Sequence, residues 1–124
     1  MPVNTPDIAV RGYDVVAYFD DQAVPGDPAI ASEYEGTQYY FSNPANKERF
    51  DANPAQFAPA YGGNCATAMS EGNVFGIDPT NFKVRDGRLF LFYRGTAGDT
   101  KPQWDAEEAD RLRQADEHWA RLNS

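Results

Sequence analysis

The stretch that decides the fold is NFKVRDGRLFLFYR, residues 81–94. Two runs rich in β-branched and aromatic side chains flank Asp86-Gly87, a pair that suits a two-residue type I′ turn because both central positions need a positive φ. The sequence therefore predicts a β-hairpin closed at this turn. Pairing outward from the turn gives one face that we expect to be core: Phe82, Val84, Leu89, Leu91 and Tyr93.

The opposite face of the predicted hairpin is half apolar. It carries Lys83, Arg85 and Arg88, but also Phe90 and Phe92. Such a face is either covered by another element or exposed as an association surface. The sequence therefore leaves open a homodimer or another protein partner that uses Phe90 and Phe92.

The segments before this hairpin predict a second strand pair. Residues 8–19 contain an apolar, β-rich cluster and are expected to be extended. Residues 20–30 hold two prolines and a glycine, which favour a loop. Residues 33–41 predict two short strands around Glu35-Gly36.

Helices are predicted in the middle and at the end of the chain. Asn43-Pro44 and Asn53-Pro54 each place a capping side chain before a proline at the first helical position, which indicates two short helices. Their buried anchors are expected to be Phe50 and Phe57. Residues 104–122 predict a longer amphipathic helix with Asp105 as cap and Glu108 in the capping-box position. Its apolar stripe is Leu112, Ala115, Trp119 and Leu122.

Together these patterns predict an α+β fold: a small antiparallel sheet with short helices and a C-terminal amphipathic helix packed on it. No internal repeat or linker is visible, so residues 1–124 are expected to form a single domain. One cysteine excludes an internal disulfide.

Charge and hydropathy exclude several classes of partner. The formal net charge of −8 argues against nucleic acid, because such binding depends on neutralising phosphates with Lys and Arg. No apolar run approaches the roughly 20 residues of a membrane span. The N-terminus lacks the basic-then-apolar layout of a signal peptide, which favours a cytoplasmic location.

The candidate functional residue is the lone cysteine in YGGNCATAM, residues 61–69. If Asn64 caps a short helix, Cys65 is its first residue, where unpaired backbone N–H groups favour a thiolate. Gly62 and Gly63 would let the backbone turn sharply and approach a ligand. The alternative is an inert, buried cysteine that fills the core, the commoner use of a free cysteine.

Catalytic and metal sets are incomplete. The single histidine, His118, lies off the apolar stripe of its helix, so a Cys65–His118 dyad is the weaker expectation. Cys65 with Met69, four residues on, offers soft sulfur ligands to copper(I), whereas structural zinc usually takes four Cys or His ligands. Asp14 lies among apolar neighbours in RGYDVVAYF and would need a hydrogen-bond partner if buried.

These motifs in this order resemble the YHS domain family. The segments GYDVVAYF, YEGTQYYFSN, YGGNCA and FKVRDGRLFLFY, followed by a helix ending in a tryptophan, cover residues 8–122. The resemblance implies a link to metal handling, in which a cysteine often follows the aromatic strand; here Ser42 stands at that place. Many stand-alone members resemble exported proteins, which implies a location other than the cytoplasm.

Three functional hypotheses follow. The first is a small non-enzymatic module that binds a small ligand or a transition metal, copper or zinc, near Cys65. The second is a thiol-based enzyme or redox protein that uses Cys65, and the third is a protein-interaction module. The residues predicted to line the first site are Asp14, Tyr18, Tyr61, Gly62, Gly63, Asn64 and Cys65, with Cys65 and Met69 as metal ligands.

Overall fold

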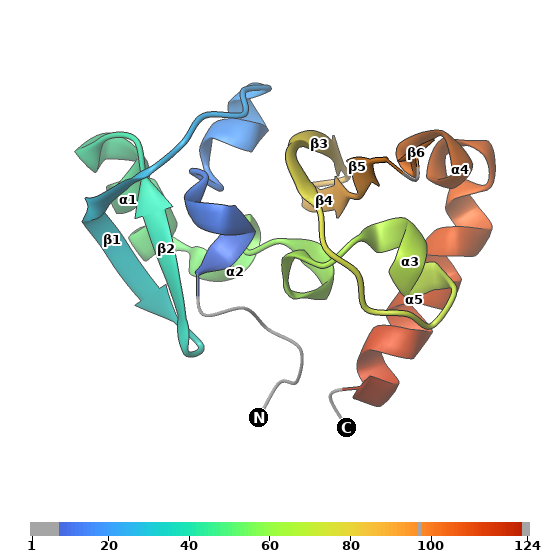
Figure 1. Ribbon diagram of the computed structural model, residues 1–124. Helices are drawn as coiled ribbons and strands as arrows, with labels where there is room; N and C mark the ends of the chain where they lie inside the picture. Colours follow the sequence, from blue (N-terminus) through green and yellow to red (C-terminus); the bar gives the residue numbers. More distant parts are fainter. Residues whose placement is uncertain (1–7, 97, 123–124) are drawn as a thin grey trace.

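The computed structural model describes residues 8–96 and 98–122. Residues 1–7, which hold half of the segment considered for a signal peptide, lie outside the described residues. Short helices and small antiparallel sheets alternate along the chain and a longer helix ends it, which confirms the predicted α+β class (Figure 1). With η for a 3-10 helix, the elements are η1 (Ala9–Gly12), η2 (Ala17–Asp20), β1 (Asp27–Tyr34), β2 (Thr37–Phe41), α1 (Pro44–Ala52), α2 (Pro54–Phe57), η3 (Ala60–Gly63), α3 (Ala66–Ser70), β3 (Asp78–Arg85), β4 (Arg88–Phe92), β5 (Arg94–Gly95), β6 (Gly98–Asp99), α4 (Lys101–Ala106) and α5 (Glu108–Leu122).

Both predicted hairpins form. β1 pairs with β2 around Glu35-Gly36, and β3 pairs with β4 around Asp86-Gly87. All four turn residues have a positive φ, as the type I′ geometry requires. β1 begins at Asp27, inside the segment predicted as a loop, because an irregularity in the pairing lets Asp27 lie opposite Phe41.

The two hairpins belong to an internal structural repeat, so the expectation of no repeat is wrong. From the turn before each hairpin to the end of the hairpin, a residue of the first copy corresponds to the residue 51 positions later in the second copy. Asp27 lies opposite Phe41 just as Asp78 lies opposite Phe92, and both ladders are then interrupted for three residues of the first strand. Figure 1 shows the copies as neighbouring parts of the molecule, the first around β1 and β2 and the second around β3 and β4.

The repeat begins before each hairpin with three consecutive residues of positive φ. In the first copy these are Val10, Arg11 and Gly12, and the second copy has them at residues 61–63. The prediction that residues 8–19 are extended is wrong, because the left-handed turn and η2 curl the segment. Only the glycine at the end of each turn is a residue that favours this conformation in both copies.

The backbone hydrogen bonds repeat with the same shift. The N–H of Asp14 donates to the carbonyl of Val24 at 2.9 Å, and the N–H of Cys65 donates to the carbonyl of Phe75 at 3.1 Å. Sequence comparison misses this relation because few side chains are shared. The identical pairs between residues 9–43 and their counterparts are Ala9/Ala60, Gly12/Gly63, Ala17/Ala68, Asp27/Asp78, Pro28/Pro79, Gly36/Gly87 and Phe41/Phe92.

Two apolar clusters hold the molecule together, and β4 serves both. Leu89 and Leu91 join the first cluster, which also contains the buried apolar residues of the first copy. Phe90 and Phe92 join the second cluster, where both pack on Trp104 of α4 at ring distances of 5.3 and 5.8 Å. Of the two possibilities that the sequence leaves open for Phe90 and Phe92, the structure shows the covered face: the second cluster buries both rings, so they form no exposed association surface.

The predicted apolar stripe of the C-terminal helix is confirmed, but the predicted first residue of this helix is wrong. Leu112, Ala115, Trp119 and Leu122 pack on the second cluster as predicted. The helix is broken at Glu107 into α4 and α5, and α4 starts at Lys101, so Asp105 is not a cap.

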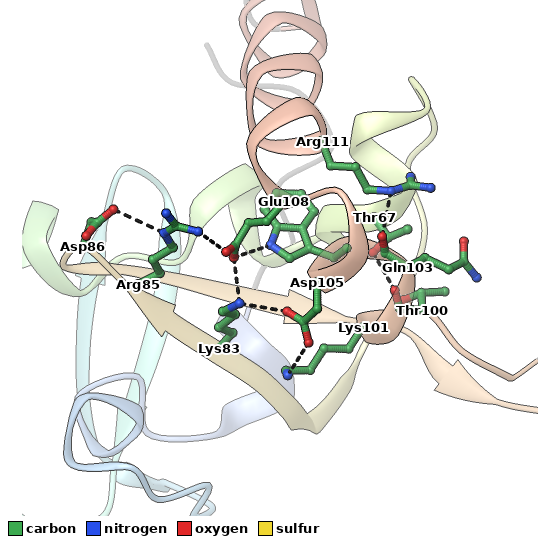
Figure 2. A network of polar contacts seen from close by, with 11 residues as sticks. Thr67, Lys83, Arg85, Asp86, Thr100, Lys101, Gln103, Asp105, Glu108 and Arg111 are labelled. Carbon is green, nitrogen blue, oxygen red and sulfur yellow. Dashed lines mark hydrogen bonds and ion pairs between the residues drawn. The ribbon is translucent and has the colours of Figure 1, made fainter.

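An ion-pair network fastens the two helices to β3. Asp105 pairs with Lys83 at 2.8 Å and with Lys101 at 3.0 Å. Glu108 pairs with Lys83 and Arg85 and accepts a hydrogen bond from the indole of Trp104 (Figure 2). Because Asp105 and Glu108 serve this network, neither forms the predicted capping box. Among the described helices, none is long and apolar enough to cross a membrane.

Candidate functional site

Cys65 is itself the cap of α3. Its sulfur accepts hydrogen bonds from the backbone N–H of Ala68 at 3.5 Å and of Tyr93 at 3.3 Å, and lies 3.4 Å from the hydroxyl of Thr100. The side chain is completely buried. The sulfur is therefore an acceptor that joins the start of α3 to the end of β4 and to the cap of α4.

Asn64 does not cap this helix, contrary to the prediction from the sequence. Its side-chain amide donates to the carbonyl of Tyr61 at 2.8 Å and so closes the left-handed turn of η3. The turn leaves the capping role to the next residue, Cys65.

A pocket of about 550 Å³ lies beside the sulfur. Cys65 and Thr100 form part of its wall, together with Tyr93 and the loop residues Val74 and Phe75. Val74 is 42% and Phe75 52% exposed, and the Phe75 ring packs edge-on against Tyr93 at 5.0 Å. The pocket thus combines an apolar, aromatic side with hydrogen-bonding groups, within the size range of small-molecule sites.

Asp14 is the first-copy counterpart of Cys65 and is also completely buried. One carboxylate oxygen accepts from the N–H of Val16 at 2.9 Å and of Ala17 at 3.3 Å. The other accepts from the N–H of Ser42 at 2.9 Å, which is the counterpart of the Tyr93 N–H that donates to Cys65. Asp14 therefore has the partners that its burial requires, and it lies in the other copy from the pocket.

Ser42 and Asn46 complete the shell around Asp14. The Ser42 hydroxyl donates to the carboxylate at 2.8 Å, and the side-chain amide of Asn46 donates to the same oxygen at 2.8 Å. The position at which the family resemblance places a metal-linked cysteine is thus used here to hold Asp14.

Tyr18 and Tyr61 are buried and hydrogen-bonded away from the pocket. The Tyr18 hydroxyl donates to the carbonyl of Pro79 at 2.6 Å, and the Tyr61 hydroxyl donates to Asp116 at 2.8 Å. Burial is the main cause that raises the pKa of both phenols, and Asp116 adds to the effect at Tyr61. Both side chains therefore stay neutral and serve as structural donors.

The structure brings one of the predicted site residues to the pocket. Of the predicted residues, Cys65 lines it, whereas Gly62, Gly63 and Asn64 belong to the η3 turn that leads up to it. A Cβ added at Gly63 would meet the side chains of Pro59 and Val10 at 3.5 and 3.9 Å, so this glycine faces other protein atoms and not an open space.

Met69 is buried on another side of α3. It belongs to the second apolar cluster, whereas Cys65 belongs to the first. In residues 8–96 and 98–122 no three His, Cys, Asp or Glu side chains lie close enough to hold a metal ion. The donor set therefore does not fit a closed copper or zinc centre made from these residues alone.

His118 does not form a dyad with Cys65. Its ring lies next to Gly72, since a Cβ added at this glycine would meet the imidazole at 3.4 Å. Gly72 follows the C-terminal end of α3 and Cys65 precedes its N-terminal end, so the imidazole and the sulfur lie at opposite ends of this helix.

Most of the residues that line the pocket carry no motif that predicts them from the sequence. Thr100 and Gln103 come from a helix start whose cap is predicted at Asp105, five residues after the observed cap, Thr100. Asn73, Val74 and Phe75 come from a loop that carries no motif. The available signal was the pair Val74-Phe75, two large apolar residues in a short segment bounded by glycines.

These features define a small α+β protein with a buried cysteine in the wall of a pocket that is partly apolar and partly polar. Residues 15–61 match the family model of the YHS domain, which confirms the resemblance seen in the sequence. The matched part contains η2, the first hairpin, α1 and α2, and it ends before Cys65. No curated protein and no solved structure matches the chain.

Proposed function

We propose that this protein is a non-enzymatic binding module that holds a small ligand in the pocket beside Cys65. The observation that carries the proposal is the pocket itself, about 550 Å³ in volume. Its exposed aromatic residue, Phe75, would contribute apolar contact, and Thr100 and Asn73 would contribute hydrogen bonds. The match to the YHS domain agrees with a binding module.

A small organic ligand fits the residues better than a metal ion. The sequence predicts copper(I) or zinc at Cys65 and Met69, but Met69 packs in the second apolar cluster, away from the cluster that holds Cys65. Among the described residues no three His, Cys, Asp or Glu side chains lie close enough to complete such a site. The titration that tests the proposal therefore includes both metals as well as organic fragments.

The thiol-enzyme alternative depends on access to the sulfur. The sulfur accepts hydrogen bonds from two backbone N–H groups, and the side chain is completely buried. We expect iodoacetamide to alkylate Cys65 much more slowly in the native protein than in the unfolded protein at neutral pH. Fast alkylation of the native protein would favour the thiol enzyme over the binding module.

The proposal is tested by titrating ¹⁵N-labelled protein with a fragment library, copper(I) and zinc while amide shifts are recorded. We expect fragments to shift the amides of the pocket, and Phe75→Ala to weaken their binding about threefold to tenfold through loss of aromatic contact. The Phe75 carbonyl that pairs with Cys65 is retained in this variant.

Val84→Ala is the matched control, because Val84 is also an exposed apolar residue and does not line this pocket. It should leave the affinity unchanged. A complete absence of shifts at the pocket with every fragment and both metals would refute the proposed function.

A further inference from the structure

The structural repeat shows what covers the counterpart of this pocket in the first copy. Helix α1 lies there. Its Asn46 donates to Asp14 at 2.8 Å, and its Arg49 pairs with Asp20 at 3.0 Å. One helix thus presents an amide and a guanidinium to two acidic side chains, which are the counterparts of Cys65 and Glu71.

In the second copy the corresponding helix is displaced. With the shift of 51, the cap of α1, Asn43, corresponds to Arg94, yet the cap of α4 is Thr100, six positions later. The strands β5 and β6 occupy this extra length.

Counting from the caps, the residues that correspond to Asn46 and Arg49 are Gln103 and Ala106. Gln103 lines the pocket and is exposed, and Figure 2 shows its side chain extending away from the ion-pair network. Ala106 has no charge to offer. The guanidinium of the first copy therefore has no counterpart on α4.

Glu71 is left at the pocket with a weak partner. It lines the pocket, and its side chain is 52% exposed. Arg111 approaches it at 3.5 Å, but this guanidinium also donates to the Ser70 hydroxyl at 2.9 Å and to the Gln103 carbonyl at 3.1 Å. Among the described residues that line the pocket, Glu71 is the single acidic residue, and there is no Lys or Arg.

From these observations we propose that the pocket takes a small organic cation, an amine or guanidinium joined to an aromatic or apolar body. Its cation would pair with Glu71, as Arg49 pairs with Asp20, and its body would lie on Phe75 and Val74. The net charge of −8 also attracts a cation and repels an anion. This inference rests on the proposed function, because it names the ligand class of the same pocket.

The test uses three probes that share one aromatic body: benzylamine, benzyl alcohol and benzoate. Each is titrated into the ¹⁵N-labelled full chain at low and at high salt. We expect benzylamine to bind about tenfold more tightly than benzyl alcohol and benzoate to bind most weakly, since a charge-assisted hydrogen bond to a carboxylate is added only by the amine. The advantage of benzylamine should shrink at high salt.

Glu71→Gln is the decisive variant, and Asp20→Asn is its matched control in the first copy. Both side chains are 52% exposed, so neither change should prevent folding. Glu71→Gln should abolish the preference for benzylamine, whereas Asp20→Asn should preserve it.

The outcomes separate this inference from the proposed function. Equal binding of all three probes would overturn the cation, and a preference for benzylamine that survives in Glu71→Gln would overturn its pairing with Glu71. Either result would still leave a ligand-binding pocket. Binding of neutral fragments without binding of benzylamine would also overturn the cation and leave the pocket. Failure of every probe and every library fragment to shift the pocket amides would overturn both.

Discussion

At the scale of single residues, Asp14 and Cys65 show how one backbone position accepts two chemistries. Both side chains are buried acceptors that receive a backbone N–H from the following helix and another from the residue after the second strand of the hairpin. The carboxylate has two oxygens and gathers five donors, whereas the single sulfur gathers fewer. The first copy is therefore closed around its acceptor, and the second copy is open beside it.

Asp14→Asn tests this role of the carboxylate. In the variant, an NH₂ group replaces one of the two carboxylate oxygens. If it faces the Ser42 N–H and the Asn46 amide, these buried donors lose their acceptor. We expect the free energy of unfolding to fall by about 2–4 kcal/mol. Urea denaturation followed by circular dichroism measures it. Asp27→Asn is the control, because Asp27 is exposed and accepts locally from Ala29, and a loss as large as that of Asp14→Asn would contradict the argument.

Tyr39 gives the molecule an alkaline limit. Burial is the largest cause that raises its pKa to about 12 from the ordinary value of 10.0, and Glu35 and Tyr34 add to it. The folded state therefore keeps a proton that the unfolded state loses between these two values. The contribution of Tyr39 to the free energy of unfolding is fully present below pH 10. It falls by about 1.4 kcal/mol for each pH unit as the pH rises from 10 towards 12.

The contribution of Tyr39 is isolated by comparing the wild type with Tyr39→Phe. Urea denaturation at pH 9 and pH 11 should show a smaller loss of stability in the variant, because it lacks the Tyr39 phenol. The loss that remains comes from groups that both proteins share, such as Tyr18 and Tyr61, whose pKa values are also raised by burial. The same loss in both proteins would show that Tyr39 ionises alike in the folded and unfolded states.

At the scale of elements, the turns of the two hairpins are equivalent and should respond equally to the same substitution. Gly36 has φ +82° and Gly87 has φ +76°, and no atom lies within 4 Å of a Cβ added at either position. The cost of alanine is therefore backbone strain alone, about 1–2 kcal/mol. We expect Gly36→Ala and Gly87→Ala to lower the unfolding free energy by amounts that agree within about 0.5 kcal/mol. A cost confined to one hairpin would contradict the equivalence.

The elements that could be predicted are those with a local chemical cause. Asp86-Gly87 predicts its turn because positive φ is cheap for this pair, and Asn43 predicts a helix start because its side chain caps the N–H of Asn46. The left-handed turn at Val10 and Arg11 has no such cause, since neither residue favours a positive φ. Packing against the rest of the molecule imposes it.

The candidate site follows the same division. Cys65 can be predicted as a candidate because it is the chain's one cysteine and lies just after a pair of glycines. Thr100 and Gln103 cannot be predicted, because their place at the pocket depends on the displacement of α4 by β5 and β6. That displacement is recognised only by comparison with the first copy, where α1 begins directly after β2.

At the scale of the whole molecule, the two copies are not independent units. The first apolar cluster joins Phe41 and Phe50 of the first copy to Leu89 and Leu91 of the second. The opposite face of β4 presents Phe90 and Phe92 to the second cluster. Because one strand lies between both clusters, loss of packing in the first must reach the second, and we expect a single cooperative unfolding transition.

Phe41→Leu tests this coupling from the far side of the molecule. Phe41 is completely buried and packs on Phe50 at 5.2 Å, so the smaller side chain should lower the unfolding free energy by about 1–2 kcal/mol. The loss should be the same when unfolding is followed by tryptophan fluorescence, which reports Trp104 and Trp119 at the second cluster, and by amide exchange in β2. Phe75→Ala is the control, because Phe75 is exposed at the pocket and should leave both signals close to the wild type. If the fluorescence transition stayed in place while exchange in β2 accelerated, the copies would unfold separately and β4 would not couple them.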